Sequence, residues 1–250
     1  MAEANIKQIL ADGNIIKCCM LSELSTPNLA RMFNRFGFDC LLVDCEHGYF
    51  DLTDTANIIA VASGYDFPII IRVAREQQHN AAKYLDMGAR GILLANVTDA
   101  EQVKELANSC LYAPEGARGV STFRAHTNYN GQDTAQIMKN ANSKNLVIAQ
   151  IESKEAVEAL DAITAIPGLD GILLGPNDFT QHIGAFGQYQ HPLVSDAIIK
   201  MVASASRQGK WSGVITSNEN LLRRCCEAGM SFFCSDSELS MLQTGARVTL

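Results

Sequence analysis

The sequence predicts an α/β protein folded as a (β/α)8 barrel, the TIM-barrel fold, in a single domain. Its 250 residues contain eight short apolar runs, most of them separated by stretches with helical periodicity. The runs are hydrophobic almost without alternation, which is typical of parallel strands buried on both faces. Eight strand-helix units in a chain of this length indicate a closed barrel. A doubly wound open sheet is the alternative, because it has the same local pattern.

Each expected strand is a short, mainly apolar run. In chain order the expected strands are 14–21, 39–44, 68–73, 91–95, 146–151, 171–174, 211–216 and 231–234. Apolar residues recur at helical spacing in the segments between them. The expected helices are 53–63, 77–87, 99–107, 154–165, 193–207 and 218–228. Several of them end just before a glycine, a common helix C-cap, at Gly64, Gly88, Gly209 and Gly229.

One segment interrupts this rhythm. Residues 110–132 are rich in Gly, Asn and Thr and contain Arg118, Arg124 and His126. A loop of this length usually does more than connect two elements. Arg124 and His126 either bind a distal carboxylate or hydroxyl group, or are simply solvated. No repeat, low-complexity segment or linker divides the chain, so we expect residues 1–250 to form one domain.

Composition and charge favour a small-molecule partner. The formal charge is -7, and no Lys/Arg cluster is present, so the chain lacks the features of a nucleic-acid or anionic-membrane binder. The first residues have no basic segment followed by an apolar run, and we expect a cytoplasmic protein without a targeting signal. The eight cysteines form no CxxC motif and several lie in apolar runs, which indicates free, buried thiols in a reducing compartment.

Polar residues lie at or just after the ends of five expected strands. In a barrel the active site lies at the carboxyl ends of the strands, so these residues are the candidates for chemistry. In chain order they are Asp44, Glu46 and His47; Arg72; Gln150 and Glu152; Gly175, Asn177 and Asp178; and Ser235 and Asp236. Any one of them has an ordinary explanation as a helix cap or a solvated turn. Their convergence is what that explanation accounts for poorly.

Glu152 and Asp178 are the natural metal pair. Two carboxylates completed by waters suit Mg2+ or Mn2+ and leave positions open for the oxygens of a substrate. Softer ions such as Co2+ or Zn2+ are also compatible with this pair. The alternative is structural, because each acid also stands where it could cap a helix. Gly175 would let backbone N–H groups approach a bound carboxylate.

Arg72 and His47 are the candidates for proton and anion chemistry. A lone guanidinium is costly to bury, so Arg72 should face an anion, or else pair with Asp44 or Glu46. His47 follows two acids that can orient it, which favours a general base over a structural histidine. Asp86, near the end of an expected helix, has no signal of its own beyond a solvated acid. Nucleotide-binding and nucleophilic-serine motifs are absent from the sequence.

These residues lie in motifs that resemble those of the class II, metal-dependent pyruvate aldolases. That family includes 4-hydroxy-2-oxoheptane-1,7-dioate aldolase and 2-dehydro-3-deoxygalactarate aldolase, within a citrate lyase-like superfamily. The resemblance covers nearly the whole chain. It rests on VDCEHG at 43–48, IIRV at 70–73, YLDMGARGIL at 84–93, APEGARGV at 113–120, VIAQIES at 147–153 and GILLGPNDF at 171–179.

The resemblance implies a role for each candidate. Glu152 and Asp178 would be the metal ligands, and Arg72 would bind the keto oxygen of pyruvate and steady its enolate. His47 matches the catalytic histidine and Asp86 the acid that partners it. Supporting positions correspond to Asp44 and Gln150, and backbone amides at Gly175 and Asn177 would hold the pyruvate carboxylate. The family also implies a (β/α)8 barrel whose final helix is exchanged between subunits, commonly in a homo-hexamer.

The implied activity is cleavage of a 4-hydroxy-2-oxo acid to pyruvate and an aldehyde. The same site would also support oxaloacetate decarboxylation or citryl- or malyl-type acyl-CoA cleavage. A non-catalytic barrel that binds a small acid is the alternative from another class. This chain departs from the family at Leu94-Ala95-Asn96-Val97, where a proline is usual, and at 121–130 and 211–213. Because these segments flank the expected aldehyde side, the aldehyde is the least transferable feature.

Overall fold

The computed structural model describes residues 5–248, and they form a closed barrel of eight parallel strands in sequence order. Strand β1 pairs with both β2 and β8, which closes the sheet. The strands are β1 (Ile16–Leu21), β2 (Cys40–Asp44), β3 (Ile69–Val73), β4 (Gly91–Leu94), β5 (Leu146–Ile151), β6 (Gly171–Leu174), β7 (Trp211–Ile215) and β8 (Phe232–Ser237). The barrel prediction is confirmed, and every expected strand is present.

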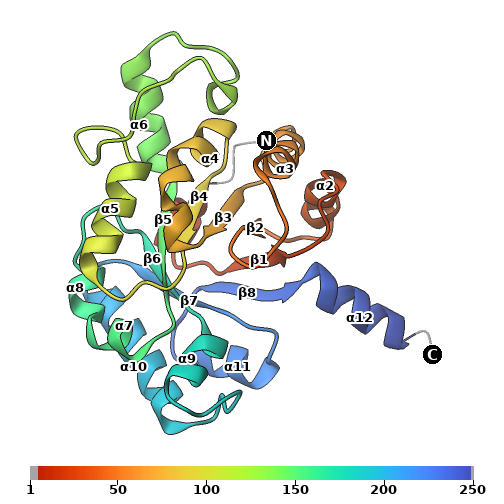
Figure 1. Ribbon diagram of the computed structural model, residues 1–250, viewed down its shortest axis with the longest axis vertical. Coiled ribbons are helices and arrows are strands. Elements are labelled where there is room, and N and C mark those ends of the chain that lie inside the picture. The colour runs from red at the N-terminus through yellow and green to blue at the C-terminus, as the bar shows by residue number, and fades with distance from the viewer. Residues whose placement is uncertain (1–4, 249–250) are drawn as a thin grey trace.

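Helices surround the barrel (Figure 1). They are α1 (Ile6–Ala11), α2 (Asn28–Arg35), α3 (Leu52–Ser63), α4 (Ala81–Met87), α5 (Ala100–Cys110), α6 (Thr134–Lys144), α7 (Lys154–Glu158), α8 (Leu160–Thr164), α9 (Pro176–His182), α10 (Pro192–Arg207), α11 (Glu219–Glu227) and α12 (Glu238–Val248). Two 3-10 helices are also present, η1 (Arg75–Asn80) and η2 (Ala125–Thr127). The helix expected at 77–87 is therefore a 3-10 turn followed by α4, and the one expected at 154–165 is divided at Ala159.

The strands are buried on both faces, as their continuous hydrophobicity predicts. Side chains such as Ile70, Ile148 and Leu173 fill the inside of the barrel, while Ile71 and Val147 pack under the helices. Because successive side chains point to opposite faces, residues two positions after an inward side chain also face inward. This periodicity directs the polar residues at the strand ends toward the barrel axis.

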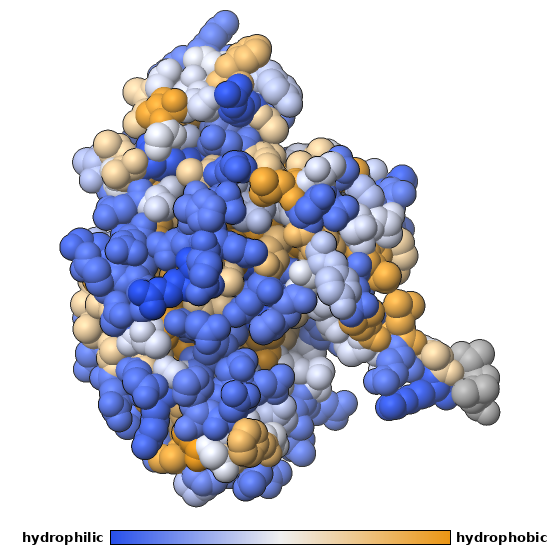
Figure 2. Space-filling model, in the orientation of Figure 1, coloured by the Kyte–Doolittle hydropathy of each residue, from blue (hydrophilic) through white to orange (hydrophobic). Residues whose placement is uncertain are grey.

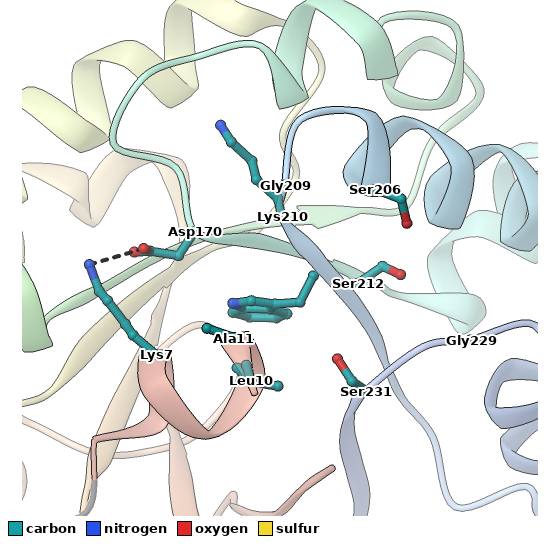
Figure 3. A pocket seen from close by; sticks show the side chains of 11 residues that line it. Lys7, Leu10, Ala11, Asp170, Ser206, Gly209, Lys210, Ser212, Gly229 and Ser231 are labelled. Atoms are coloured by element: carbon teal, nitrogen blue, oxygen red, sulfur yellow. Dashed lines mark ion pairs between the residues drawn. The ribbon is translucent and has the colours of Figure 1, made fainter. Parts of the chain in front are cut away.

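The amino-terminal end of the barrel is closed by α1. Lys7 on this helix forms a 2.9 Å ion pair with Asp170, which precedes β6 (Figure 3). The ring of Trp211 stacks on Phe232. A cavity of about 390 Å3 lies here, lined by residues of α1 and by residues that precede or begin β6, β7 and β8. Polar groups at this end of a barrel usually serve stability rather than catalysis.

Helix α12 leaves the barrel instead of packing along it (Figure 1). Glu238, at its start, is buried, and its Oε1 accepts hydrogen bonds from the backbone N–H groups of Ser22, Glu23 and Leu24. Farther along, Leu242 and Val248 are exposed, and Figure 2 shows apolar surface on this projecting helix. None of the helices within 5–248 is long and apolar enough to cross a membrane.

All eight cysteines are free thiols, and all but Cys226 are buried. The prediction of free, buried thiols is therefore correct for seven of the eight residues. Burial is the largest cause that raises the pKa of Cys45, which keeps this thiol protonated near neutral pH. The seven buried cysteines therefore pack as small apolar residues.

Candidate active site

The site is built at the carboxyl ends of β2, β3, β5 and β6. Strand register places Asp44 and Arg72 side by side, and it places Gln150 beside Leu173 and Ile151 beside Leu174. The predicted residues Asp44, Arg72, Gln150 and Glu152 are all buried. The structure therefore gathers most of the candidates at one end of the barrel, as the strand-end argument predicts.

Asp44 and Arg72 form a two-pronged ion pair. Arg72 Nε donates to Asp44 Oδ1 at 2.9 Å, and Nη2 donates to Oδ2 at 2.6 Å. Burial acts to raise the pKa of Asp44, but the bonds and charge of Arg72 outweigh it and hold this pKa below its usual value. The backbone N–H groups of Glu46 and His47 also donate to Asp44 Oδ1, which shapes the turn after β2. Asp44 thus fixes the orientation of the guanidinium.

Glu46 is a second acid near the Arg72 guanidinium and approaches the same Nε as Asp44. Its Oε2 is 3.4 Å from Arg72 Nε and 4.0 Å from His47 Nε2, and its Oε1 accepts a 2.9 Å bond from the Asn96 side chain. Burial is the largest effect on this carboxyl and raises its pKa, against the lowering effect of Arg72 and His47. One guanidinium therefore serves two acids.

Glu152 is buried without a cation of its own. Its Oε1 accepts the backbone N–H of Asn96 at 2.6 Å, and its Oε2 accepts Gln150 Nε2 at 2.5 Å. Burial raises its pKa from 4.5 to about 7, helped by the charges of Glu46 and Asp178. A buried carboxyl with so large a shift is a candidate functional group.

Gly175 makes room for that carboxylate. A Cβ at this position would lie 2.3 Å from Glu152 Oε2 and 2.7 Å from Gln150 Nε2, so a larger residue would displace both. The predicted role of its amide is wrong, because the Gly175 N–H already donates to Ile151 O at 3.0 Å within the barrel. Asn177 lies in the first turn of α9, where backbone N–H groups lack partners within the helix, and its amide stays a predicted carboxylate binder.

His47 and Asp86 are not brought together. The side chain of His47 is 69% exposed, and its acidic neighbour is Glu46. Asp86, on α4, pairs with the buried Arg118 at 2.5 Å, and the guanidinium of Arg118 lies 4.5 Å from the centre of the Tyr112 ring. Within this chain Asp86 does not contact His47 as predicted, because its carboxylate is ion-paired with Arg118. The long loop thus has a structural role through Arg118.

A cavity of about 460 Å3 opens at this end of the barrel. His47, Arg72, Asn177 and Asp178 lie along its lining. The lining also includes hydroxyl and acidic groups from the ends of β7 and β8 and from α12, namely Thr216, Ser217, Asp236, Ser237 and Ser240. The cavity is large enough for a small organic acid, and Arg72 is its one Lys or Arg side chain among the described residues.

The charges of the site fit a divalent cation. The charges of Asp44 and Asp178 raise the pKa of Glu46, and those of Glu46 and Asp178 raise the pKa of Glu152. Arg72 lowers the pKa of Asp44, Glu46 and Glu152. A buried carboxylate needs a counter-charge to remain ionised, and Mg2+ or Mn2+ takes one or two carboxylates plus waters and substrate oxygens. Within 5–248 no group of three or more His, Cys, Asp or Glu is arranged to hold a metal, so a cation at Glu152 and Asp178 would keep several positions open.

Comparison with known proteins gives the family. The family model for HpcH/HpaI aldolase/citrate lyase matches residues 17–241. The chain belongs to this family. Members of the HpcH/HpaI family are aldolases and lyases of carbon-carbon bonds, and the chain is an enzyme of this class. The resemblance seen in the sequence motifs is therefore confirmed.

Individual HpcH/HpaI relatives agree with this assignment. The chain is 31% identical over 236 residues to the hydroxypyruvate/pyruvate aldolase of Roseobacter denitrificans, covering 94% of this chain and 91% of that one. It is 31% identical over 224 residues to the 5-keto-4-deoxy-D-glucarate aldolase of Klebsiella pneumoniae, covering 90% and 87%. The crystal structure of an HpcH/HpaI aldolase from Desulfitobacterium hafniense superposes with a TM-score of 0.90 at 28% identity, covering 98% of this chain and 94% of that one.

The strand-end analysis missed Asn96, as well as the hydroxyl groups of Thr216, Ser217, Ser237 and Ser240 on the cavity lining. Asn96 follows β4 by two positions and contacts two acids, yet its side chain is neither charged nor a usual metal ligand. The signal available in the sequence was the Leu94-Ala95-Asn96-Val97 segment, where the resemblance led us to expect a proline. Asn also tolerates the left-handed backbone that Asn96 adopts, with a φ of 53°.

Proposed function

We propose that the protein is a class II, metal-dependent aldolase. It cleaves a 4-hydroxy-2-oxo acid to pyruvate and an aldehyde, or forms the acid from these two compounds. The observation that carries this proposal is the buried Glu152 carboxylate, which has no ion-pair partner, is affected by the charge of Asp178 and lies near a guanidinium held in place by Asp44. This arrangement suits an oxo acid, whose carboxylate and keto oxygens need positive charge on more than one side.

Glu152 and Asp178 are the residues that would hold the cation. When bound, a divalent cation supplies Lewis-acid stabilisation of the negative charge that develops on the keto oxygen. Mg2+ and Mn2+ fit the all-oxygen donor set best, while Co2+ and Zn2+ are compatible with it. Gln150 keeps the Glu152 carboxylate oriented through its 2.5 Å hydrogen bond.

Arg72 provides the second positive group. Its Nε and Nη2 are engaged by Asp44, which fixes the plane of the guanidinium and leaves Nη1 to donate to the keto oxygen of the substrate. A donor that is already oriented costs no reorganisation when charge develops. Asp44 therefore acts through Arg72, as a positioning residue.

His47 is the proposed general base. It lies on the cavity lining and is exposed, so it can reach the hydroxyl of a bound 4-hydroxy-2-oxo acid and accept its proton as the carbon-carbon bond breaks. The Asn177 backbone N–H, at the start of α9, is the proposed donor to the substrate carboxylate. Asp86 has no step in this scheme, because it is paired with Arg118.

The cavity does not favour the acyl-CoA alternative. Coenzyme A carries several phosphates, which proteins usually bind with Lys and Arg side chains. Arg72 is the one such residue along the cavity within the described chain, and Asp178 and Asp236 add negative charge there. Oxaloacetate decarboxylation needs the same groups as pyruvate chemistry and is best regarded as a side activity of the same site.

We further propose that the protein is a cytoplasmic homo-oligomer, a hexamer by its resemblance to the family. The projecting helix α12, with exposed Leu242 and Val248, supports an association in which another copy covers it. The proposed partners are small oxo acids, without nucleic acid or membrane. Size-exclusion chromatography with light scattering tests the assembly directly, and a monomer at micromolar concentration would contradict it.

The enolate step can be tested before the aldehyde is known. Pyruvate is incubated in D2O with purified protein, and its methyl protons are followed by proton NMR with Mg2+ or with excess chelator. We expect the methyl signal to decay only when the metal is present. Absence of exchange with Mg2+, Mn2+, Co2+ and Zn2+ would remove the central step of the proposal.

A further inference from the structure

Asn96 is the residue that contacts both acids at the edge of the site. Its backbone N–H donates to Glu152 Oε1 at 2.6 Å, and its side-chain Nδ2 donates to Glu46 Oε1 at 2.9 Å. Glu152 directly follows β5 and Glu46 lies two residues after β2, and these strands stand on either side of β4 in the barrel, with β3 between β2 and β4. One residue thus ties together acids from separate parts of the rim.

The backbone of Asn96 is in an unusual conformation that makes this double contact possible. Its φ of 53° lies in the left-handed region, which is costly for most residues and most accessible to Gly, Asn and Asp. The turn directs the N–H of Asn96 to Glu152, while Ala95 N–H continues the ladder to Val73 O at 3.0 Å. Strained residues that persist in this way often lie at functional sites.

We propose that Asn96 is a positioning residue of the active site, which orients the metal-binding Glu152 through its backbone N–H and holds Glu46 through its side-chain amide. With Oε1 bound to Asn96, Glu46 presents Oε2 to Arg72 Nε at 3.4 Å and to His47 Nε2 at 4.0 Å. A carboxylate released from Asn96 would instead compete with an oxo acid for Arg72. The assignment rests on the proposed function, since it presumes a cation at Glu152 and chemistry at Arg72 and His47.

Two substitutions separate the two contacts. Asn96→Gly keeps the N–H and favours the left-handed backbone but removes the amide, so it tests the contact with Glu46 alone. For this variant we expect the Mn2+ affinity to stay within threefold of wild type. We expect the rate of pyruvate methyl-proton exchange to fall roughly 10-fold, as for the loss of one hydrogen bond to a charged group. Asn96→Ala also disfavours the left-handed backbone, and we expect it to weaken Mn2+ binding by a further factor of roughly 5.

Asn96→Asp separates positioning from a purely structural role. Aspartate has the same shape and tolerates the same backbone, so a structural role predicts nearly wild-type behaviour. The positioning role predicts that the rate of pyruvate methyl-proton exchange falls on the order of 100-fold, because a carboxylate would face Glu46 in place of a hydrogen-bond donor. Mn2+ binding should be retained or tightened, since negative charge is added. Asn128→Asp is the matched control, because Asn128 also has a left-handed backbone, with a φ of 51°, but lies in the 110–132 loop.

The experiment measures Mn2+ binding to metal-free protein by electron paramagnetic resonance and metal-dependent exchange of the pyruvate methyl protons. The assignment is supported if the wild-type protein catalyses exchange and both Asn96→Gly and Asn96→Asp bind Mn2+ but catalyse exchange at least threefold more slowly. Exchange within threefold of wild type in either variant, or loss of Mn2+ binding in Asn96→Gly, overturns it and leaves the proposed function intact. No exchange by the wild-type protein with any metal overturns the proposed function and this assignment with it.

Discussion

The two ends of the barrel differ in how they provide a counter-charge for their acidic side chains. At the amino-terminal end, Asp170 has a lysine partner at 2.9 Å and also accepts the backbone N–H of Val147 at 2.8 Å. At the carboxyl end, Glu152 has hydrogen bonds but no cation, and other acids raise its pKa further. Burial raises the pKa of Asp170 too, but Lys7 and the N–H of Val147 act against this effect, so the chain itself supplies the counter-charge. The arrangement around Glu152 becomes favourable when a ligand brings positive charge, which is the property of a binding site.

Removing the charge of Glu152 should have the largest effect. We expect Glu152→Gln to lower turnover on the order of 1000-fold, because several kcal/mol of metal-derived stabilisation would be lost. The fold should survive, since Gln150 Oε1 is buried without a partner and an amide flip would let it accept from the new side chain. Turnover assays and Mn2+ titration of the variant measure the two effects. If the variant binds Mn2+ as tightly as wild type, Glu152 is not a metal ligand, and the proposed difference between the two ends of the barrel is contradicted.

Arg72→Lys should have the next largest effect. Lysine keeps the charge but lacks the planar fork that Asp44 holds, so we expect kcat to fall roughly 100-fold, as for loss of an oriented donor. Mn2+ binding should stay close to wild type, because Arg72 is not a ligand. Steady-state kinetics and metal titration measure the two effects separately. Near wild-type turnover would show that Arg72 serves only the ion pair with Asp44.

The stability of the metal-free protein should depend on pH through Glu152. Its pKa is raised from 4.5 to about 7 in the folded state, so the folded chain keeps a proton that the unfolded chain has lost. Stability from this group is therefore present below about pH 4.5 and declines as pH rises toward 7, by on the order of 1–3 kcal/mol. Denaturant titrations of wild type and Glu152→Gln isolate this contribution as their difference. A difference that is constant between pH 4.5 and 8 would contradict the raised pKa.

The amino-terminal end should show the smallest effect and none on catalysis. Lys7→Met removes the partner of Asp170 and a 3.0 Å bond to Asn142 O. Because both charged groups are partly exposed, we expect a loss of only about 1 kcal/mol. Thermal unfolding should show a fall in Tm of roughly 2–4 °C, with turnover within twofold of wild type. A large loss of turnover would mean that the two ends are coupled.

Much of the fold could be predicted from the sequence, because burial on both faces leaves a clear apolar signal. Helix α6 has no buried residue, so it lacks the periodic pattern that would have revealed it. Helix α9 begins with Pro176 and is short, and the same residues read as a polar turn. Helix α2, by contrast, buries Leu29, Ala30 and Phe33. Their helical spacing could have predicted this helix, although it was not among the expected ones.

The site was predictable where chemistry and strand position coincide. Asp44, Arg72 and Glu152 are charged residues at strand ends, and the structure brings them to one rim. Asn96 was not predictable, since its two contacts depend on a left-handed turn and on which strands lie beside β4. The pairing of Asp86 with Arg118 depends on the path of the 110–132 loop, which no periodicity specifies.

The most direct test of the central claim is a crystal structure of the protein with Mn2+ and pyruvate, using the anomalous signal of manganese to locate the ion. The account predicts one strong peak at ligand distance from the carboxylates of Glu152 and Asp178, with the keto oxygen of pyruvate facing Arg72. A fully occupied manganese site elsewhere, or pyruvate bound away from Arg72 with no ion at these carboxylates, would contradict it.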